Sequence, residues 1–344
     1  MRVLITSVQA PFIKGGAESL AVGLLNAIRE ANHEVDFVTA PFSYEPTKEI
    51  IRSIQFWEEQ DFSRFNGNEV DAVICLKFPT FYLNHSRKIL WLLHQHRPVY
   101  DLWDQMKQGG HRFSWSDRSL RRKTSRLDNS YLSEIPHRFT ISSNVCKRLM
   151  HYNGIESKPL YHPPPLSPQA GPHESFIFCP SRVEFLKRQE MILGAVHHLQ
   201  SNVRLVFAGG GSSLKSLKQL TLAQELEHRV EWLGPISDAK MLDLYSRCLA
   251  VFFGPYDEDY GYVTLEAMQA AKPVITCSDS GGPLEFVVDE ETGFVVEPKV
   301  ELIAKAMDRL ALDPGLAQQL GSAGLDRYKS LGLSWSNVVQ TLLG

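Results

Sequence analysis

The sequence has few cysteines, and none of the five stands close to another. They are Cys75, Cys146, Cys179, Cys248 and Cys277. Structural zinc sites and disulfide frameworks use cysteines at short, repeated spacings. The scattered pattern therefore argues against both, and we expect buried, reduced thiols.

The sequence also lacks long hydrophobic runs and a strong net charge. No stretch approaches the roughly 18 apolar residues of a membrane-spanning helix, and the apolar run at residues 1–6 is too short for a signal peptide. The net charge of −3 gives no reason to expect nucleic-acid binding. These absences favour a cytoplasmic protein whose contact with a membrane, if any, is peripheral.

What the sequence does contain is a regular alternation of strand and helix patterns. Its 344 residues are about twice the length of a typical domain and leave room for two cores. Strands are expected at residues 2–7, 34–39, 71–76, 88–93 and 139–142, and again at 175–179, 203–208, 230–233, 250–254, 273–276 and 294–296. Helices are expected to end near residue 30, to start near residue 144, and to span 189–199, 214–226, 264–271 and 335–343. Such alternation predicts parallel sheets covered on both faces, so the expected fold class is α/β with two doubly wound domains.

Three consecutive prolines, at residues 163–165, mark the boundary between the halves. Because proline is excluded from helix interiors and central strands, residues 161–173 are expected to form a linker. We therefore expect one domain at residues 1–160, a second at 174–330, and a C-terminal helical segment at about 331–344. Ligands of doubly wound sheets bind beyond the carboxyl ends of the strands, so a cleft between the domains is the expected binding site.

Two glycine-rich segments follow expected strands. Lys14, Gly15 and Gly16 precede the first helix, and Gly209 and Gly210 follow the strand at 203–208. Glycine lets the backbone approach a phosphate closely, and a helix N-terminus offers N–H groups without helical partners. Each segment is therefore either part of a phosphate site or a plain turn. Neither half opens with a complete Gly-x-Gly-x-x-Gly pattern, which argues against a nicotinamide dehydrogenase.

Two basic residues, Arg182 and Lys187, follow the first strand of the second half. Fixed cations at the carboxyl end of a strand would stabilise the negative charge of a departing diphosphate. The alternative is that both are solvated surface charges.

The segment at residues 257–266 runs from an apolar strand into a helix. Glu258 in the loop and Glu266 in the helix would accept hydrogen bonds from sugar or ribose hydroxyls. Alternatively, Glu258 is solvated and Glu266 only favours the helix dipole. The backbone N–H groups available to an anion lie in the stretch Tyr260, Gly261, Tyr262 and Val263.

Two places in the sequence carry residue pairs that could bind a metal. Asp257 and Asp259 match the acidic pair of metal-dependent sugar transferases, but nearby cations fill the electrostatic role of the metal and two residues are too few. His94 and His96 have no evident third ligand, so His94 is either a hydrogen-bond donor to a sugar hydroxyl or a structural histidine. We expect neither a metal nor another cofactor.

Residues 117–126 are locally basic and include Arg118, Arg121, Arg122, Lys123 and Arg126. This segment is either a contact for anionic lipid or a lipid-linked acceptor, or a solvated helix face.

Taken in order, these segments resemble the retaining glycosyltransferases of family 4, over nearly the whole chain. The resemblance is carried by Glu258 and Glu266 with seven residues between them, and by the stretches at 273–275, 280–285 and 292–295. It implies the GT-B architecture of two Rossmann-like domains facing a cleft. The first would bind the acceptor and the second the nucleotide-sugar donor, with the helix at Trp335 crossing back onto the first domain.

The resemblance also implies residue roles. Glu258 would contact the donor sugar, and Glu266 would hold the ribose. Arg182 and Lys187 would grip the diphosphate. Gly16 would lie near the phosphates and acceptor, and His94 near the C6 hydroxyl of the sugar.

The implied function is retaining, metal-independent transfer of a sugar from a nucleotide-diphosphate donor. The acceptor would be a glycan, a lipid-linked molecule or a small molecule in surface polysaccharide or glycolipid biosynthesis. A nucleotide-sugar epimerase on the same fold, or a non-catalytic nucleotide-sugar-binding protein, are the alternatives.

Overall fold

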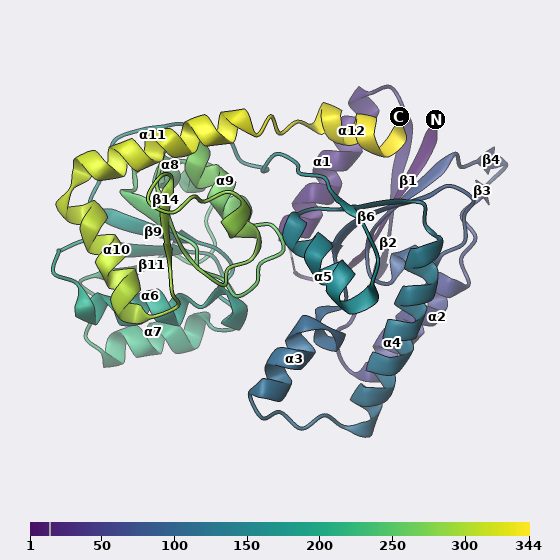
Figure 1. Ribbon diagram of the computed structural model, residues 1–344, viewed down its shortest axis with the longest axis horizontal. Coiled ribbons are helices and arrows are strands. Elements are labelled where there is room, and N and C mark those ends of the chain that lie inside the picture. The colour runs from purple at the N-terminus through teal and green to yellow at the C-terminus, as the bar shows by residue number, and fades with distance from the viewer. Residues whose placement is uncertain (14) are drawn as a thin grey trace. The chain divides into compact units, whose positions relative to one another are not determined.

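A computed structural model of the chain describes residues 1–13 and 15–344. These residues form two compact units (Figure 1). The first comprises Met1–His162 together with Ser334–Gly344, and the second comprises Pro163–Leu333. Residues 161–173, around the point of division, contain no helix or strand.

The first unit is built on a six-stranded parallel sheet in the order β2-β1-β5-β6-β7-β8. The strands are β1 (Arg2–Gln9), β2 (Glu34–Pro41), β5 (Ala72–Lys77), β6 (Lys88–His94), β7 (His137–Thr140) and β8 (Lys158–Pro159). A separate hairpin joins β3 (Arg64–Phe65) and β4 (Asn68–Glu69). Every residue of β5 is buried, as expected for a parallel strand covered on both faces.

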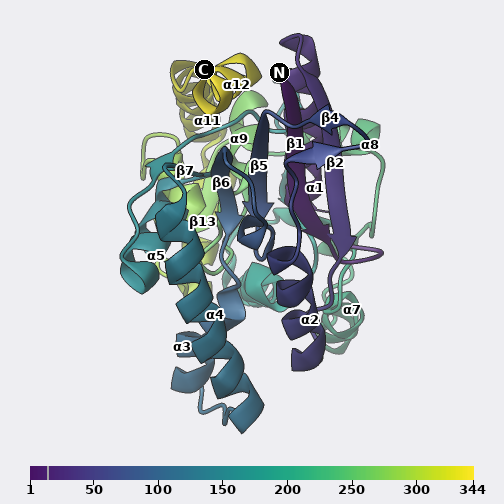
Figure 2. The same cartoon turned by 90° about the vertical axis from the view of Figure 1, so that its right-hand side faces the viewer.

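Helices pack around this sheet. They are α1 (Gly16–Glu30), α2 (Thr47–Glu58), α3 (Asp101–Gln108), α4 (Trp115–Glu134), α5 (Ser143–Asn153) and α12 (Trp335–Leu343), with short 3-10 turns η1 (Thr80–Tyr82) and η2 (Arg97–Val99). α12 packs against α1, and α4 packs against both α2 and α5 (Figure 2). In α1 the buried residues Leu20, Leu24 and Ile28 recur at helical spacing and face the core.

The second unit repeats this plan with a six-stranded parallel sheet in the order β11-β10-β9-β12-β13-β14. The strands are β9 (Phe176–Pro180), β10 (Arg204–Ala208), β11 (Val230–Trp232), β12 (Ala250–Phe252), β13 (Val274–Cys277) and β14 (Gly293–Val296). The helices are α6 (Gln189–Ala195), α7 (Leu214–Ala223), α8 (Asp238–Arg247), α9 (Tyr262–Gln269), α10 (Val300–Leu312) and α11 (Pro314–Ser330), with 3-10 turns η3 (Phe185–Lys187), η4 (Val196–His198) and η5 (Gly282–Glu285). α6 packs with α10, and α9 packs with α11.

Several boundaries differ from those expected from sequence. The helix expected at 264–271 spans Tyr262–Gln269, because Gly261, at φ +93°, already ends the preceding loop. The strand expected at 139–142 ends at Thr140, because the Ser142 hydroxyl caps α5 by accepting a hydrogen bond from the Val145 N–H (3.1 Å). The helices expected at 189–199 and 214–226 end earlier, the first passing into η4.

The composition predicted reduced, buried cysteines and no membrane-spanning helix. All five cysteines are free, as expected. Four of them are buried, but Cys146 is only half-buried, so the expectation that every cysteine is buried was wrong for this residue. Within residues 1–13 and 15–344, no helix combines the length and apolarity needed to cross a bilayer.

Candidate functional site

Three loops meet at the carboxyl edge of the second sheet. They follow β9, β12 and β13, and the strand order reverses at β9, which has β10 on one side and β12 on the other. Ligands of doubly wound sheets bind at such a reversal. Backbone hydrogen bonds join the loops: the Tyr256 N–H donates to the Leu186 carbonyl (2.8 Å), and the Glu258 N–H donates to the Ser280 carbonyl (2.9 Å). The three loops therefore form one connected surface.

An ion pair between Lys187 and Glu258 lies on this surface. The two side chains are 15% and 23% exposed, so both are mostly buried yet still reach solvent. The Lys187 ammonium also lies 5.3 Å from the centre of the Phe253 ring. Partial burial lowers the local dielectric constant and strengthens the pair. Two residues 71 positions apart in the chain, both singled out from sequence, are thus in direct contact.

Arg188, which the sequence interpretation missed, follows Lys187 in the chain and binds the two neighbouring loops. Its guanidinium donates to both carboxylate oxygens of Asp279 (2.8 and 2.6 Å) and to the carbonyls of Gly254 (2.9 Å) and Pro255 (2.8 Å). Arg188 has a left-handed backbone (φ +52°), an unusual conformation for a residue with a side chain. No spacing or motif in the sequence marks this residue, since its partners lie on two other loops.

Arg182 is not brought into contact with Lys187. Its side chain is exposed, and within the described part of the chain it has no ion pair with a carboxylate. Its backbone is held nevertheless, because the Gln189 amide donates to the Arg182 carbonyl (2.9 Å). The guanidinium is therefore anchored at its base and exposed at its tip.

The glycines after β10 are explained by a close approach of two loops. A Cβ at Gly209 (φ +133°) would lie 2.0 Å from the Ser181 carbonyl oxygen, and one at Gly211 would lie 2.2 Å from that of Val183. The Val183 N–H donates to the Gly210 carbonyl (2.8 Å). Gly209 and its neighbours thus allow the loop that carries Arg182 to pack on the end of β10. Direct contact of Gly209 or Gly210 with a donor stays a prediction.

Helix α9 begins shortly after Glu258 in the chain, at Tyr262. A Cβ at Gly261 would lie 3.0 Å from Pro283 Cγ, so glycine also lets the loop after β13 pack closely. Tyr260 is buried and packs edge-on against Tyr262, with ring centres 5.4 Å apart. The first N–H groups of a helix point out of its N-terminus and carry the positive end of its dipole, and in α9 they belong to Tyr262 and Val263.

Glu266 lies on the buried side of the same helix, with 5% of its surface exposed. The Tyr245 hydroxyl donates to its carboxylate (2.7 Å). Burial raises the pKa of Glu266 to about 7, while the hydrogen bonds from Tyr245 and from the Leu166 backbone act in the opposite direction. The side chain is therefore close to its protonation midpoint at neutral pH.

In the first unit, the N-terminus of α1 is already bound to a carboxylate. The Gly15 N–H, in a segment expected to be either part of a phosphate site or a plain turn, donates to Glu18 Oε2 (2.8 Å), and Glu18 Oε1 lies 3.4 Å from the Lys77 ammonium. Gly16 is the first residue of α1. Lys14 lies outside the described residues. Sequence inspection missed this arrangement, although a glutamate three residues after a helix cap is a known signal.

The two histidines considered as metal ligands, His94 and His96, have different surroundings. His94 ends β6, is half-buried, and has Nδ1 2.7 Å from the Gln95 carbonyl oxygen. His96 is buried and stacks on Phe78, with ring centres 4.9 Å apart. Burial, with a smaller contribution from His94, lowers the pKa of His96 to about 3, so this ring is neutral. Among the residues that the structure describes, no group of three or more His, Cys, Asp or Glu could hold a metal ion.

Comparisons with known sequences place the second half of the chain near a known family. Residues 167–327 match the family model of the glycosyl transferases group 1. The chain is 28% identical over 296 residues to the alpha-1,3/1,6-mannosyltransferase ALG2 of Mus musculus, which covers 76% of this chain and 70% of that protein. The match to the protein of the same name from Dictyostelium discoideum is 35% identical but covers only 37% of this chain and 32% of that protein.

Solved structures resemble the chain over its whole length. Sucrose-phosphate synthase from Thermosynechococcus elongatus has a TM-score of 0.79 at 18% identity, covering 98% of this chain and 96% of that one. Anabaena HepE in complex with UDP-glucose has a TM-score of 0.71 at 17% identity, covering 99% and 98%. These likenesses confirm the expected α/β fold with two doubly wound, Rossmann-like domains.

Proposed function

We propose that this chain, whose residues 167–327 match the family model of the glycosyl transferases group 1, transfers a hexose from a nucleotide-diphosphate donor with retention of configuration. The Lys187–Glu258 pair at the strand-order reversal is the observation that carries this proposal. The donor binds the second unit, and the acceptor binds the first.

The pair combines the two functions that a nucleotide-sugar site needs. Glu258 accepts hydrogen bonds from the sugar hydroxyls, but a bare carboxylate would repel the adjacent diphosphate. Lys187 neutralises that carboxylate and stabilises the diphosphate charge that grows as the sugar leaves. The exposed Arg182 and the N-terminus of α9, with Tyr260, Gly261, Tyr262 and Val263, supply further positive potential.

Glu266 binds the ribose of the donor in this proposal. Its carboxylate is oriented by the Tyr245 hydroxyl and buried in the same unit. A ribose hydroxyl would donate to it, and that hydrogen bond favours the ionised form. Gly209 and Gly210 shape the adjacent loop and allow the diphosphate to approach the backbone.

The chemical step requires no nucleophile from the protein. The bond between the anomeric carbon and the diphosphate breaks, and the acceptor oxygen bonds to that carbon on the same face. The acceptor proton passes to a diphosphate oxygen, so charge and atoms balance. The protein contributes positioning and charge stabilisation, and its cations take the role that a metal has in other transferases.

The first unit holds the acceptor in this proposal, with Gly16 near it and His94 as a hydrogen-bond partner of a sugar hydroxyl. The ALG2 relatives, named as mannosyltransferases, and HepE, solved with UDP-glucose, favour mannose or glucose as the donor sugar. A glycan or lipid-linked acceptor is consistent with both. Peripheral contact with a membrane through Arg118–Arg126 forms part of the same proposal.

A donor screen followed by product analysis tests this function. The purified chain would be incubated in EDTA with GDP-mannose, UDP-glucose or ADP-glucose and simple glycoside acceptors. We expect nucleotide-diphosphate release that depends on acceptor and is lost in Glu258→Gln, with an α-linked product by NMR. A β-linked product would rule out retention, and activity only after metal addition would rule out the metal-free site. Matched surface variants Glu231→Gln and Glu227→Gln should keep full activity.

A further inference from the structure

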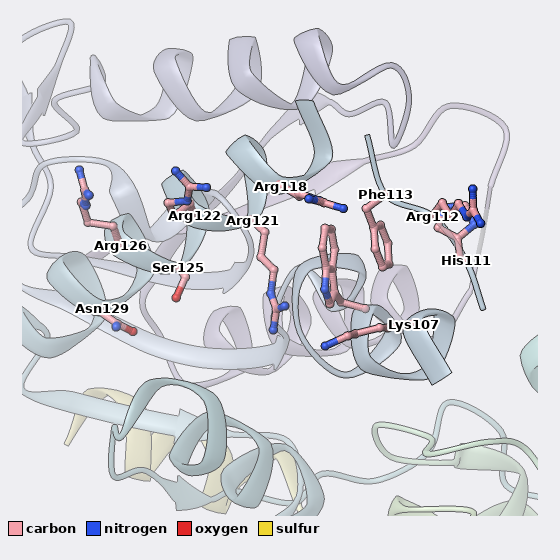
Figure 3. Close-up of a pocket in the computed structure, with 11 residues that line it drawn as sticks. Lys107, His111, Arg112, Phe113, Arg118, Arg121, Arg122, Ser125, Arg126 and Asn129 are labelled. Atoms are coloured by element: carbon pink, nitrogen blue, oxygen red, sulfur yellow. The ribbon is translucent and has the colours of Figure 1, made fainter. Parts of the chain in front are cut away.

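A cationic pocket lies in the first unit, between α3 and α4, and shares no residue with the proposed donor site in the second unit. Its volume is about 860 Å³, and neither an aspartate nor a glutamate lines it. Six basic side chains line it: Lys107, Arg112, Arg118, Arg121, Arg122 and Arg126. Figure 3 shows these side chains around the pocket together with Phe113. We call it the α3–α4 pocket.

One wall of the α3–α4 pocket is fixed by aromatic stacking. Trp103 and Phe113 stack nearly parallel, with ring centres 3.4 Å apart. The Arg121 guanidinium lies 4.9 Å from the centre of the Trp103 ring, and its Nε donates to the Val99 carbonyl (3.0 Å). Arg121 is therefore held in place before any ligand arrives, which reduces the entropy cost of binding.

The other arginines are not neutralised by protein carboxylates. Of the pocket cations, Arg121 alone has an ion pair within residues 1–13 and 15–344, at 3.6 Å from Asp104. Arg118, Arg122 and Arg126 follow one another at four-residue intervals along α4. Like charges at this spacing repel each other and destabilise a helix by a few tenths of a kcal/mol per pair. An anionic ligand would remove that repulsion.

The length of this arginine row selects the ligand. Eight residues of helix span about 12 Å, which is longer than a single phosphate group. Guanidinium groups bind phosphate oxygens through paired hydrogen bonds, whereas the lysine ammonium acts as a single point charge. A group with more than one phosphate charge matches several arginines at once. The stacked Trp103–Phe113 wall gives an apolar surface beside it.

We propose that the α3–α4 pocket binds the phosphate or diphosphate group of a phosphorylated acceptor. This inference rests on the proposal that the first unit receives the acceptor, and it names the chemical class of that acceptor. The group is carried either by a soluble molecule or by a lipid. Trp115, 83% exposed and three residues before Arg118, is the kind of side chain that inserts at a bilayer interface and favours a lipid.

Calorimetric titration with inorganic diphosphate tests the pocket. The titrated protein would be the full chain carrying Arg182→Gln and Lys187→Gln, so that the proposed donor cations do not bind the probe. We expect one saturable site per chain, weakened more than about tenfold by adding Arg118→Gln and Arg122→Gln. The matched control adds Arg29→Gln and Arg64→Gln, two exposed arginines of the same unit outside the pocket, and should change affinity less than about twofold.

Absence of saturable binding, or an equal loss in the control, would overturn the proposal. Donor binding is read separately in the chain with Arg182 and Lys187 intact, where Arg118→Gln and Arg122→Gln should leave the thermal shift by nucleotide unchanged. A negative result for nucleotide binding therefore does not affect the test of the α3–α4 pocket. A negative result for the pocket likewise does not affect the test of the donor site.

Vesicle co-sedimentation then separates the two sources of the phosphate. Binding to phosphatidylcholine vesicles that contain phosphatidic acid, displaced by inorganic diphosphate and lost in Arg118→Gln with Arg122→Gln, would support a lipid-borne group. Binding of free diphosphate with no vesicle binding would support a soluble phosphorylated acceptor. Vesicle binding that diphosphate does not displace, together with no calorimetric site, reduces the pocket to general surface attraction and overturns the proposal.

Discussion

Arg188 binds Asp279 through both carboxylate oxygens, at 2.8 and 2.6 Å. The same guanidinium reaches the Gly254 and Pro255 carbonyls, at 2.9 and 2.8 Å. One side chain thus connects the loops that follow β9, β12 and β13. Because it stands next to Lys187 in the chain, it fixes the backbone from which the Lys187 side chain extends.

Replacing this arginine tests that connection. Arg188→Lys keeps the charge and the backbone conformation, but one ammonium cannot replace four directed N–H bonds. We expect the free energy of unfolding to fall by about 1–3 kcal/mol and donor affinity to fall with it. Urea unfolding and a nucleotide thermal shift measure the two effects.

The control is Arg309→Lys at a surface ion pair. Arg309 lies 2.7 Å from Glu290, with the side chains 41% and 63% exposed. Its replacement should change stability by less than about 1 kcal/mol. Equal effects of the two substitutions would show that Arg188 has no special structural role.

The Lys187–Glu258 contact predicts an unusual order of donor affinities. Lys187→Gln leaves the Glu258 carboxylate unneutralised beside the donor diphosphate, so donor binding should weaken by about tenfold or more. Adding Glu258→Gln removes the repulsion, and the double variant should bind the nucleotide diphosphate more tightly than Lys187→Gln alone. Calorimetry with the nucleotide identified in the donor screen measures this coupling.

The expected effects on the rate of sugar transfer differ from those on donor affinity. Both single variants and the double variant should lose about 10²- to 10³-fold in kcat/KM, since each lacks a group that acts on the developing charge or the sugar. A double variant that binds the nucleotide diphosphate worse than Lys187→Gln would contradict the electrostatic role assigned to Lys187.

Sequence reasoning succeeded where local pattern determines structure. The strands at 2–7, 71–76 and 88–93 have apolar runs that only a buried parallel strand explains, and the structure places β1, β5 and β6 there. Lys187 and Glu258 were both singled out, because each follows a strand whose carboxyl end lies at the same sheet edge. The fold and the loops of the site were therefore predictable.

What escaped prediction depends on contacts between distant segments. Arg188 and Asp279 are 91 residues apart in the chain, and Tyr245 and Glu266 are 21 residues apart, so no local spacing marks either pair. Long-range partners of this kind are set by the packed tertiary structure and carry no periodic signal.

Glu266 predicts a specific dependence of stability on pH. Its pKa is raised by burial from 4.5 to about 7, so the folded state binds more protons than the unfolded state between these values. The contribution of this group to the unfolding free energy is therefore highest below pH 4.5 and falls as pH rises through 7. Glu266→Gln, which stays uncharged, should lack this decline.

The comparison is made as a difference between the two chains. Relative to the parent chain, Glu266→Gln should gain stability on the order of 2 kcal/mol on going from pH 5 to pH 8, by urea unfolding. Subtracting the two profiles cancels other buried groups such as Asp128, whose pKa burial also raises to about 7. If the difference between the chains is constant with pH, Glu266 does not titrate as proposed. In the parent chain, nucleotide affinity should rise with pH through 7, because a ribose hydroxyl donates to the ionised carboxylate.

The attachment of the C-terminal helix depends on a glycine in α1. A Cβ at Gly23 would lie 2.2 Å from Cζ2 of Trp335, the first residue of α12. In an open helix, Gly→Ala would add up to about 1 kcal/mol of stability. Here the methyl group must displace an indole that also packs against Trp91, with ring centres 6.2 Å apart. We expect Gly23→Ala to lower the free energy of unfolding by about 1–3 kcal/mol, measured by urea unfolding with circular dichroism.

A matched glycine and a second substitution identify the cause. Gly324 lies within α11, where an added Cβ would be 3.5 Å from its nearest neighbour, so Gly324→Ala should be neutral or stabilising. Trp335→Leu removes the ring, and in that background Gly23→Ala should no longer destabilise. A Gly23→Ala variant as stable as Gly324→Ala would mean that α12 shifts without cost. Destabilisation that persists after Trp335→Leu would place the clash with another group.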